Sequence, residues 1–208
     1  MKYAIKQIGV FGGSFDPPHL AHKALVQAAL DELNLDEVWV LPVGIPVHKT
    51  LTSSISADCR LAWVQRMFAD IAHVRVLDWE VVKKKTSPSI DSMRSISGQL
   101  DAVPVWLMGM DAWQDLPSWK GYPEHLQYCN IAVFPRVGSK MVHHDAWQYS
   151  LPSSLQQNPG HVYVCQTILP TISATAIRQA IHSSHDVSSM LDGSLKDEIQ
   201  ARYANANG

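Results

Sequence analysis

Residues 10–22, VFGGSFDPPHLAH, join a short apolar run to the start of a helical pattern, and this join decides the fold. Gly12 and Gly13 allow backbone torsions closed to other residues and let a ligand approach the main chain closely. Ser14 adds a hydroxyl group. A helix that begins near Pro18 or His19 offers unpaired N–H groups and the positive end of its dipole. The segment therefore predicts a phosphate-binding turn between a strand and a helix.

Two histidines stand at the start of this predicted helix. His19 and His22 are three residues apart, so both lie on one face of the first turn, where they can donate hydrogen bonds to one polyphosphate. They could instead be metal ligands, although no third ligand with suitable spacing accompanies them, or solvated surface residues. The order of strand, glycines, serine, prolines and histidines favours phosphate binding.

Outward from this segment, short apolar runs alternate with amphipathic stretches, which is typical of a βαβ protein with a parallel sheet. The predicted strands are Gln7–Phe11, Glu37–Leu41, Val74–Leu77, Val103–Met108, Asn130–Phe134 and His161–Cys165. The predicted helices are Leu20–Leu33, Ala57–Phe68, Ser89–Leu100, Ser173–His182 and about Leu195–Tyr203. The polar stretch 137–160, with two prolines and several serines, is predicted to be irregular.

A second candidate site lies near the other end of the chain, in residues 171–178, TISATAIR. Ser173 suits the N-cap of a helix. Together with Thr175 and the helix dipole it would form a second anion cradle. Arg178, about one turn further on, could make a two-pronged contact with a terminal phosphate. An ordinary capped helix with a surface arginine is the alternative.

Composition limits the class of protein. With 46% hydrophobic and 17% charged residues the chain is expected to fold, and its net charge of −2 argues against a nucleic acid as the main ligand. The three cysteines form no CxxC pair, which favours a reducing compartment. No apolar run approaches the length of a membrane span. We expect a cytoplasmic protein without a membrane partner.

Two motifs resemble one known family. GGSFDPPHLAH at 12–22 is similar to the nucleotidyltransferase signature whose HxGH element begins the first helix, with Ala21 in place of glycine, and ISATAIR at 172–178 is similar to its ISxTxIR motif. The amino-acid sequence around the first motif is most similar to that of the bacterial nicotinate-nucleotide adenylyltransferases. The resemblance implies an α/β fold with a Rossmann-like doubly wound parallel sheet and helices on both faces. It also implies a single nucleotidyltransferase domain over residues 1–208, with the C-terminal helical portion, about 173–204, packed on it.

The resemblance implies a reaction and its site. AMP would pass from ATP to nicotinate mononucleotide, giving deamido-NAD and pyrophosphate, and Mg²⁺ would arrive with ATP rather than at a metal site of the protein. The implied catalytic residues are His19, His22 and Arg178. The implied ATP-binding residues are Gly12, Gly13, Ser14, Phe15, Ser173, Thr175 and Asp111. The implied acceptor-binding residues are His48, Lys49, Ser89, Trp119 and Arg136.

One departure leaves the acceptor open. Ile90 and Asp91 stand where the family has tyrosine and threonine, which would change the shape and charge of the pocket for the pyridine ring. The alternatives are an adenylyltransferase for nicotinamide mononucleotide or another phosphorylated acceptor, and a non-catalytic nucleotide-binding module. A metal hydrolase using the two histidines is a third. Whether the chain forms a homo-oligomer is also left open.

Overall fold

The computed structural model describes residues 6–46, 55–156 and 158–205, and within them the core is a single parallel sheet. The strands are β1 (Ile8–Gly13), β2 (Glu37–Pro42), β3 (Val74–Val76), β4 (Val105–Gly109), β5 (Asn130–Phe134), β6 (Gln148–Tyr149) and β7 (His161–Val164). They lie in the order β3-β2-β1-β4-β5-β7-β6, and each pair of neighbours is parallel. The strand order reverses between β1 and β4, so a crevice is expected where their carboxyl ends diverge.

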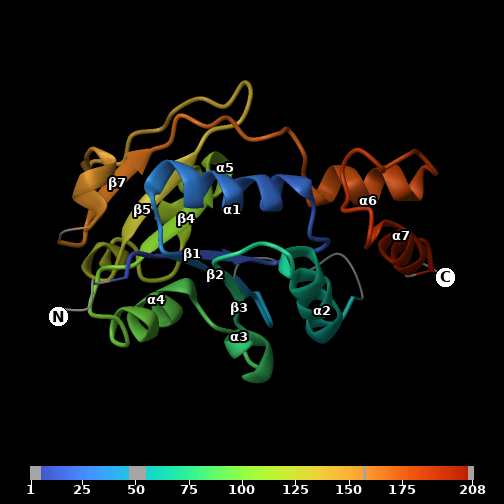
Figure 1. The fold of residues 1–208 in the computed structure, drawn as a ribbon, viewed down its shortest axis with the longest axis horizontal. Helices are drawn as coiled ribbons and strands as arrows, with labels where there is room; N and C mark the ends of the chain where they lie inside the picture. The colour runs from blue at the N-terminus through green and yellow to red at the C-terminus, as the bar shows by residue number, and fades with distance from the viewer. Residues whose placement is uncertain (1–5, 47–54, 157, 206–208) are drawn as a thin grey trace.

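Helices connect successive strands. The α-helices are α1 (Leu20–Leu33), α2 (Ala57–Phe68), α3 (Trp79–Val82), α4 (Ser89–Ser97), α5 (Met110–Asp115), α6 (Ala174–His182) and α7 (Lys196–Asn205). The 3₁₀ turns are η1 (Leu116–Ser118), η2 (Glu124–Gln127) and η3 (Pro152–Gln156). Figure 1 shows α1 and α4 on opposite sides of the sheet, with α6 and α7 together at one end of the molecule. Within the described residues, no helix has the length and apolar character of a membrane span.

The two faces of the sheet bury separate cores, because successive side chains of a strand point to opposite faces. On β4, Val105 and Leu107 pack into one core with α1 and α2, whereas Trp106 and Met108 pack into the other with α4. This arrangement confirms the predicted doubly wound α/β sheet.

The C-terminal helices share the core of α1 and α2. Ile177 and Ile181 of α6 and Ile199 of α7 belong to the same buried cluster as Val26 and Trp63. The backbone N–H of Leu20 also donates to the carbonyl of Met190, at 3.0 Å. This shared core favours the expected single domain with its helical portion packed on the sheet.

The polar stretch 137–160 is more ordered than predicted. It contains the parallel edge strand β6, paired with β7, and the turn η3. Trp147, directly before β6, is buried, and the side-chain amide of Asn130 donates to the carbonyl of Leu155 at 2.8 Å. A two-residue strand is too short to show a period of hydrophobicity, so the sequence pattern missed it.

Candidate active site

The glycine turn after β1 is held by an arginine from another element. Arg60 of α2 is 1% exposed, and its Nη1 donates to the carbonyl oxygens of Ser14 at 2.5 Å and Val43 at 2.9 Å. Its Nη2 donates to the carbonyl of Gly44 at 2.9 Å. A Cβ at Gly13 would lie 3.1 Å from the ring of Phe15, so glycine is required for this close packing. Arg60 therefore fixes the turn against the end of β2.

The histidine pair forms a stacked unit at the start of α1. The rings of His19 and His22 lie 3.6 Å apart between centroids and 17° from parallel. The backbone N–H of His19 donates to Nδ1 of His22 at 3.1 Å. A neutral His22 must then carry its proton on Nε2, which is left as a donor for a ligand.

Both imidazoles are neutral at pH 7. Burial, followed by the positive charge of Arg136, lowers the pKa of His19 to about 3. Burial, with His19 and Arg136 next in importance, holds the pKa of His22 well below its usual value. Within the described residues, no group of three His, Cys, Asp or Glu side chains is placed to hold a metal ion. The pair is arranged to donate hydrogen bonds.

Two further predicted residues follow the carboxyl ends of the neighbouring strands β4 and β5. Asp111 is the second residue of α5, which begins directly after β4, and Arg136 stands two residues after β5. Nη1 of Arg136 lies 2.8 Å from Oδ2 of Asp111. The charge of Arg136 also contributes to the lowered pKa of both His19 and His22. The predicted role of Arg136 in binding the acceptor stays a prediction.

The C-terminal motif meets the glycine turn directly. Oγ of Ser173 caps α6 by accepting from the backbone N–H of Ala176 at 3.1 Å. Nη1 of Arg178 donates to the backbone carbonyl of Asp16, across 162 residues of sequence, and lies 3.7 Å from Oδ2 of the same residue. Its Nη2 donates to Oγ1 of Thr175 at 3.3 Å. The two motifs are therefore in contact.

The glycine turn also lines a cavity of about 500 Å³. Its lining comprises Gly12, Gly13, Ser14, Val43, Pro46, Glu80, Ser87, Pro88, Ser89, Trp106, Ala112, Asp115, Ser118 and Trp119. Five of these were predicted: the two glycines and Ser14 for phosphate, and Ser89 and Trp119 for the acceptor. We call this space the acceptor cavity. His19, His22 and Arg178 are not among the residues that line it.

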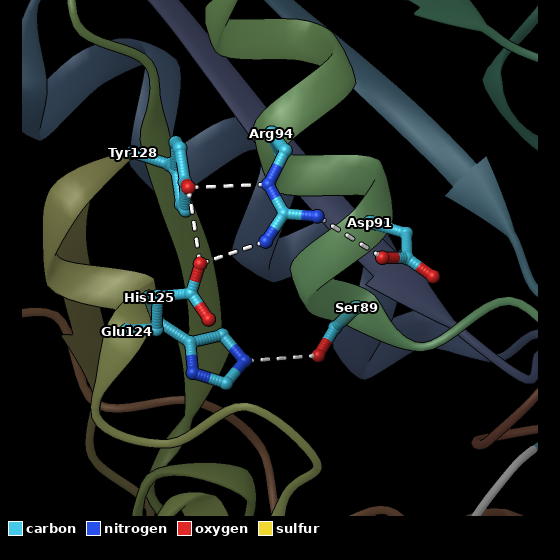
Figure 2. A network of polar contacts seen from close by, with 6 residues as sticks. All are labelled: Ser89, Asp91, Arg94, Glu124, His125 and Tyr128. Carbon is cyan, nitrogen blue, oxygen red and sulfur yellow. Dashed lines mark hydrogen bonds and ion pairs between the residues drawn. The ribbon is translucent and has the colours of Figure 1, made fainter.

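The wall of the acceptor cavity is braced from behind by polar contacts, shown in Figure 2. Oγ of Ser89 lies 3.4 Å from Nε2 of the buried His125, whose ring stands edge-on to Trp119 with centroids 6.4 Å apart. Arg94 of α4 donates from Nη2 to Glu124 at 2.7 Å. These contacts join α4 to η2 and so fix the position of two lining residues.

The expected negative charge of Asp91 is not found in the cavity. Figure 2 shows its carboxylate turned toward Arg94, and Nη1 of Arg94 lies 3.5 Å from its Oδ1. Ile90 is buried, and a Cβ at Gly121 would lie 3.1 Å from its side chain. Neither residue lines the cavity. The first turn of α4 thus directs both side chains away from this cavity, and the prediction about the charge of the pyridine pocket stays a prediction.

Three charged residues of this region were not predicted from the sequence, and two predicted residues lie outside the described part of the chain. Glu80 and Asp115 line the acceptor cavity without any motif that marks them. Arg60 was also missed, since an arginine on an amphipathic helix is usually solvated. His48 and Lys49, predicted to bind the acceptor, lie outside the described residues.

Comparisons with known proteins agree with this architecture. A sequence model described as cytidylyltransferase-like matches residues 10–180. A protein of Pseudomonas entomophila named nicotinate-nucleotide adenylyltransferase is 32% identical over 95% of this chain and 94% of its own length. A protein of the same name from Albidiferax ferrireducens is 46% identical over 65% of this chain and 68% of its own length.

The fold also matches a solved structure, the Plasmodium falciparum nicotinic acid mononucleotide adenylyltransferase complexed with NaAD. Its TM-score is 0.75 at 16% identity, with 97% of this chain and 98% of that chain covered. Fold and site together define a nucleotidyltransferase of the Rossmann-like class. The chain belongs to the cytidylyltransferase-like family and, within it, to the nicotinate-nucleotide adenylyltransferases.

Proposed function

We propose that this chain transfers AMP from ATP to nicotinate mononucleotide, giving deamido-NAD and pyrophosphate in NAD biosynthesis. The observation that carries the proposal is the contact of Arg178 with the backbone of Asp16, which brings the two phosphate-binding motifs to one place beside the acceptor cavity. The names of the relatives support the same reaction.

The glycine turn, the histidine pair and the second motif, 172–178, together form what we call the phosphate end of the site. It supplies alignment and charge stabilisation. The attacking group is a phosphate oxygen of the mononucleotide, already ionised at neutral pH, so no general base is required. Two polyanions must approach, and negative charge grows on the leaving pyrophosphate. The Nε2–H of His22 is free to donate to the α- and β-phosphates, with His19 stacked on it. Arg178, Ser173 and Thr175 hold the β- and γ-phosphates.

Mg²⁺ would bind the phosphates of ATP and reduce the repulsion between them. Because it prefers phosphate oxygens and water at such sites, it needs few ligands from the protein. Asp111 is proposed to contact the ribose of the bound nucleotide. Its carboxylate is already oriented by Arg136, and its side chain is 68% exposed, so it is accessible to a hydroxyl group.

The acceptor cavity suits a flat ring. The face of Trp119 offers a stacking surface, and Ser89 begins α4, whose N-cap residue Pro88 makes no side-chain hydrogen bond to the first turn. Uncapped N–H groups at a helix N-terminus attract a carboxylate. This helix N-terminus offsets part of the negative charge of Glu80 and Asp115 in the lining, and the names of the relatives favour nicotinate as the acceptor.

The test is an assay of pyrophosphate release from ATP and Mg²⁺, with nicotinate and nicotinamide mononucleotides compared side by side. We expect release with both substrates present and a higher kcat/KM for nicotinate mononucleotide. A preference for nicotinamide mononucleotide would overturn the assignment of the acceptor. Tight ATP binding without pyrophosphate release on either acceptor would identify a nucleotide-binding module instead.

A further inference from the structure

One side chain of α7 reaches the glycine turn. The hydroxyl of Tyr203 donates to Oδ1 of Asp16 at 2.5 Å, although the two residues are 187 positions apart. Tyr203 is 4% exposed and Asp16 is 1% exposed, so this bond is shielded from water. The ring of Tyr203 also packs near Trp63, with centroids 6.2 Å apart. A phenol–carboxylate bond with so little solvent access constrains the direction of the carboxylate.

The same carboxylate faces the arginine of the second motif. Oδ2 of Asp16 lies 3.7 Å from Nη1 of Arg178, which is too far for a hydrogen bond. The guanidinium donates instead to the backbone carbonyl of Asp16 and to Thr175. A carboxylate and a phosphate present similar paired oxygens to a guanidinium, so Asp16 and ATP are competitors for Arg178.

We propose that Tyr203 is a positioning residue of the ATP site, which turns the carboxylate of Asp16 so that Arg178 keeps N–H groups for the triphosphate. The inference rests on the proposed function and deepens it by giving α7 a role. Without the phenol, the Asp16 carboxylate loses the bond that holds its Oδ1, and a two-pronged pair of this carboxylate with Arg178 would compete with ATP.

The test is the Tyr203→Phe variant, which removes the hydroxyl and keeps the ring. We expect the dissociation constant for ATP with Mg²⁺, measured by calorimetry, to rise about three- to tenfold, the effect of one hydrogen bond. The KM for nicotinate mononucleotide should stay within about twofold. Because an unfolded fraction lowers the binding stoichiometry rather than the affinity, a folding defect is recognised in the same titration.

The matched control is Tyr163→Phe. Tyr163 of β7 also donates to a carboxylate, that of Glu32, at 3.1 Å, but it lies outside the site. Its variant loses the same kind of bond and should bind ATP with unchanged affinity. Equal losses in the two variants, or no loss in Tyr203→Phe, would overturn the inference.

A double-mutant cycle separates positioning from general stabilisation. In an Arg178→Ala background, Tyr203→Phe should weaken ATP binding no further, because its effect passes through Arg178. Additive losses would contradict the proposed route. If the unaltered protein bound ATP but released no pyrophosphate with either acceptor, the proposed function would fail, while these titrations would still decide the role of Tyr203.

Discussion

At the phosphate end, side chains from the two ends of the chain bond to one another directly, whereas the acceptor cavity is lined largely by residues between Val43 and Trp119. The histidine pair and Asp16 are buried or stacked and fixed by several bonds. Ser118 and Trp119 of the cavity remain partly or fully exposed. The glycine turn 12–14 belongs to both regions.

The difference follows from what each region must bind. The triphosphate of ATP needs hydrogen-bond donors that are already in place when it binds, because reorganising them during the reaction would raise the activation barrier. A mononucleotide acceptor is selected mainly by the shape of a cavity and a few polar groups on its wall. We therefore expect changes at the phosphate end to affect turnover or ATP affinity, and changes in the cavity to affect acceptor binding.

The largest effect is expected for His22→Ala. It removes the oriented Nε2–H donor, so kcat should fall about a thousandfold or more, while affinity for ATP falls less than about tenfold. Steady-state rates of pyrophosphate release, with ATP titrated separately, measure both. His185→Ala, an exposed histidine outside the site, is the control. Near-normal turnover would remove His22 from the mechanism.

Arg60→Met should affect both regions, because Arg60 joins the carbonyl of Ser14 to those of Val43 and Gly44. Leaving these buried carbonyls without a donor should lower the free energy of unfolding by about 2–4 kcal/mol. Both KM values should rise together. Urea unfolding measures the first effect, and Arg66→Met, at a half-exposed arginine of the same helix, should lose less. A change in only one KM would show that Arg60 does not link the two regions.

Trp119→Ala should act on the acceptor alone. Stacking of an aromatic ring contributes about 1–3 kcal/mol, so the KM for nicotinate mononucleotide should rise about tenfold or more. The KM for ATP should stay within about twofold, and Trp119→Phe should give an intermediate value. A rise in the KM for ATP of the same size would contradict the separation of the two regions.

The smallest effect concerns pH and stability. The folded-state pKa of His19 is about 3, lower than in the unfolded chain, so the unfolded state takes up more protons as the pH falls below about 6.5. Stability therefore decreases with acidification. Between about pH 7.5 and 5.5, His19→Asn should lose about 1.4 kcal/mol less unfolding free energy than the unaltered protein. Urea titrations at the two pH values measure both losses. If the variant and the unaltered protein lost the same unfolding free energy, His19 would not be held neutral.

Much of the fold follows from local pattern, because each predicted strand and helix overlaps an observed one. The short elements α3, α5 and β6 were missed, since four to six residues, or two, carry too little periodicity. The glycine turn and α6 were recognisable from glycines, caps and an arginine at fixed spacing. Pairings across the chain, such as Asp16 with Tyr203, leave no local pattern and required the fold.

The assignment of acceptor residues shows the same limit. Ser89 and Trp119 line the cavity, whereas Arg136 forms an ion pair with Asp111 and is not among the lining residues. A position directly after a strand predicts that a residue lies at the carboxyl edge of the sheet. It does not predict in which direction a long side chain such as that of arginine extends from there. The roles assigned to the individual site residues stay predictions.

The most direct test of the account is the dissociation constant for ATP with Mg²⁺ in Arg178→Ala and Trp119→Ala, measured by calorimetry. Because Arg178 is assigned to the triphosphate and Trp119 to the acceptor, ATP should bind more than about tenfold more weakly to the first variant and with unchanged affinity to the second. An unchanged affinity in Arg178→Ala, or an equal loss in both, would contradict the claim that the two ends of the chain converge on one triphosphate.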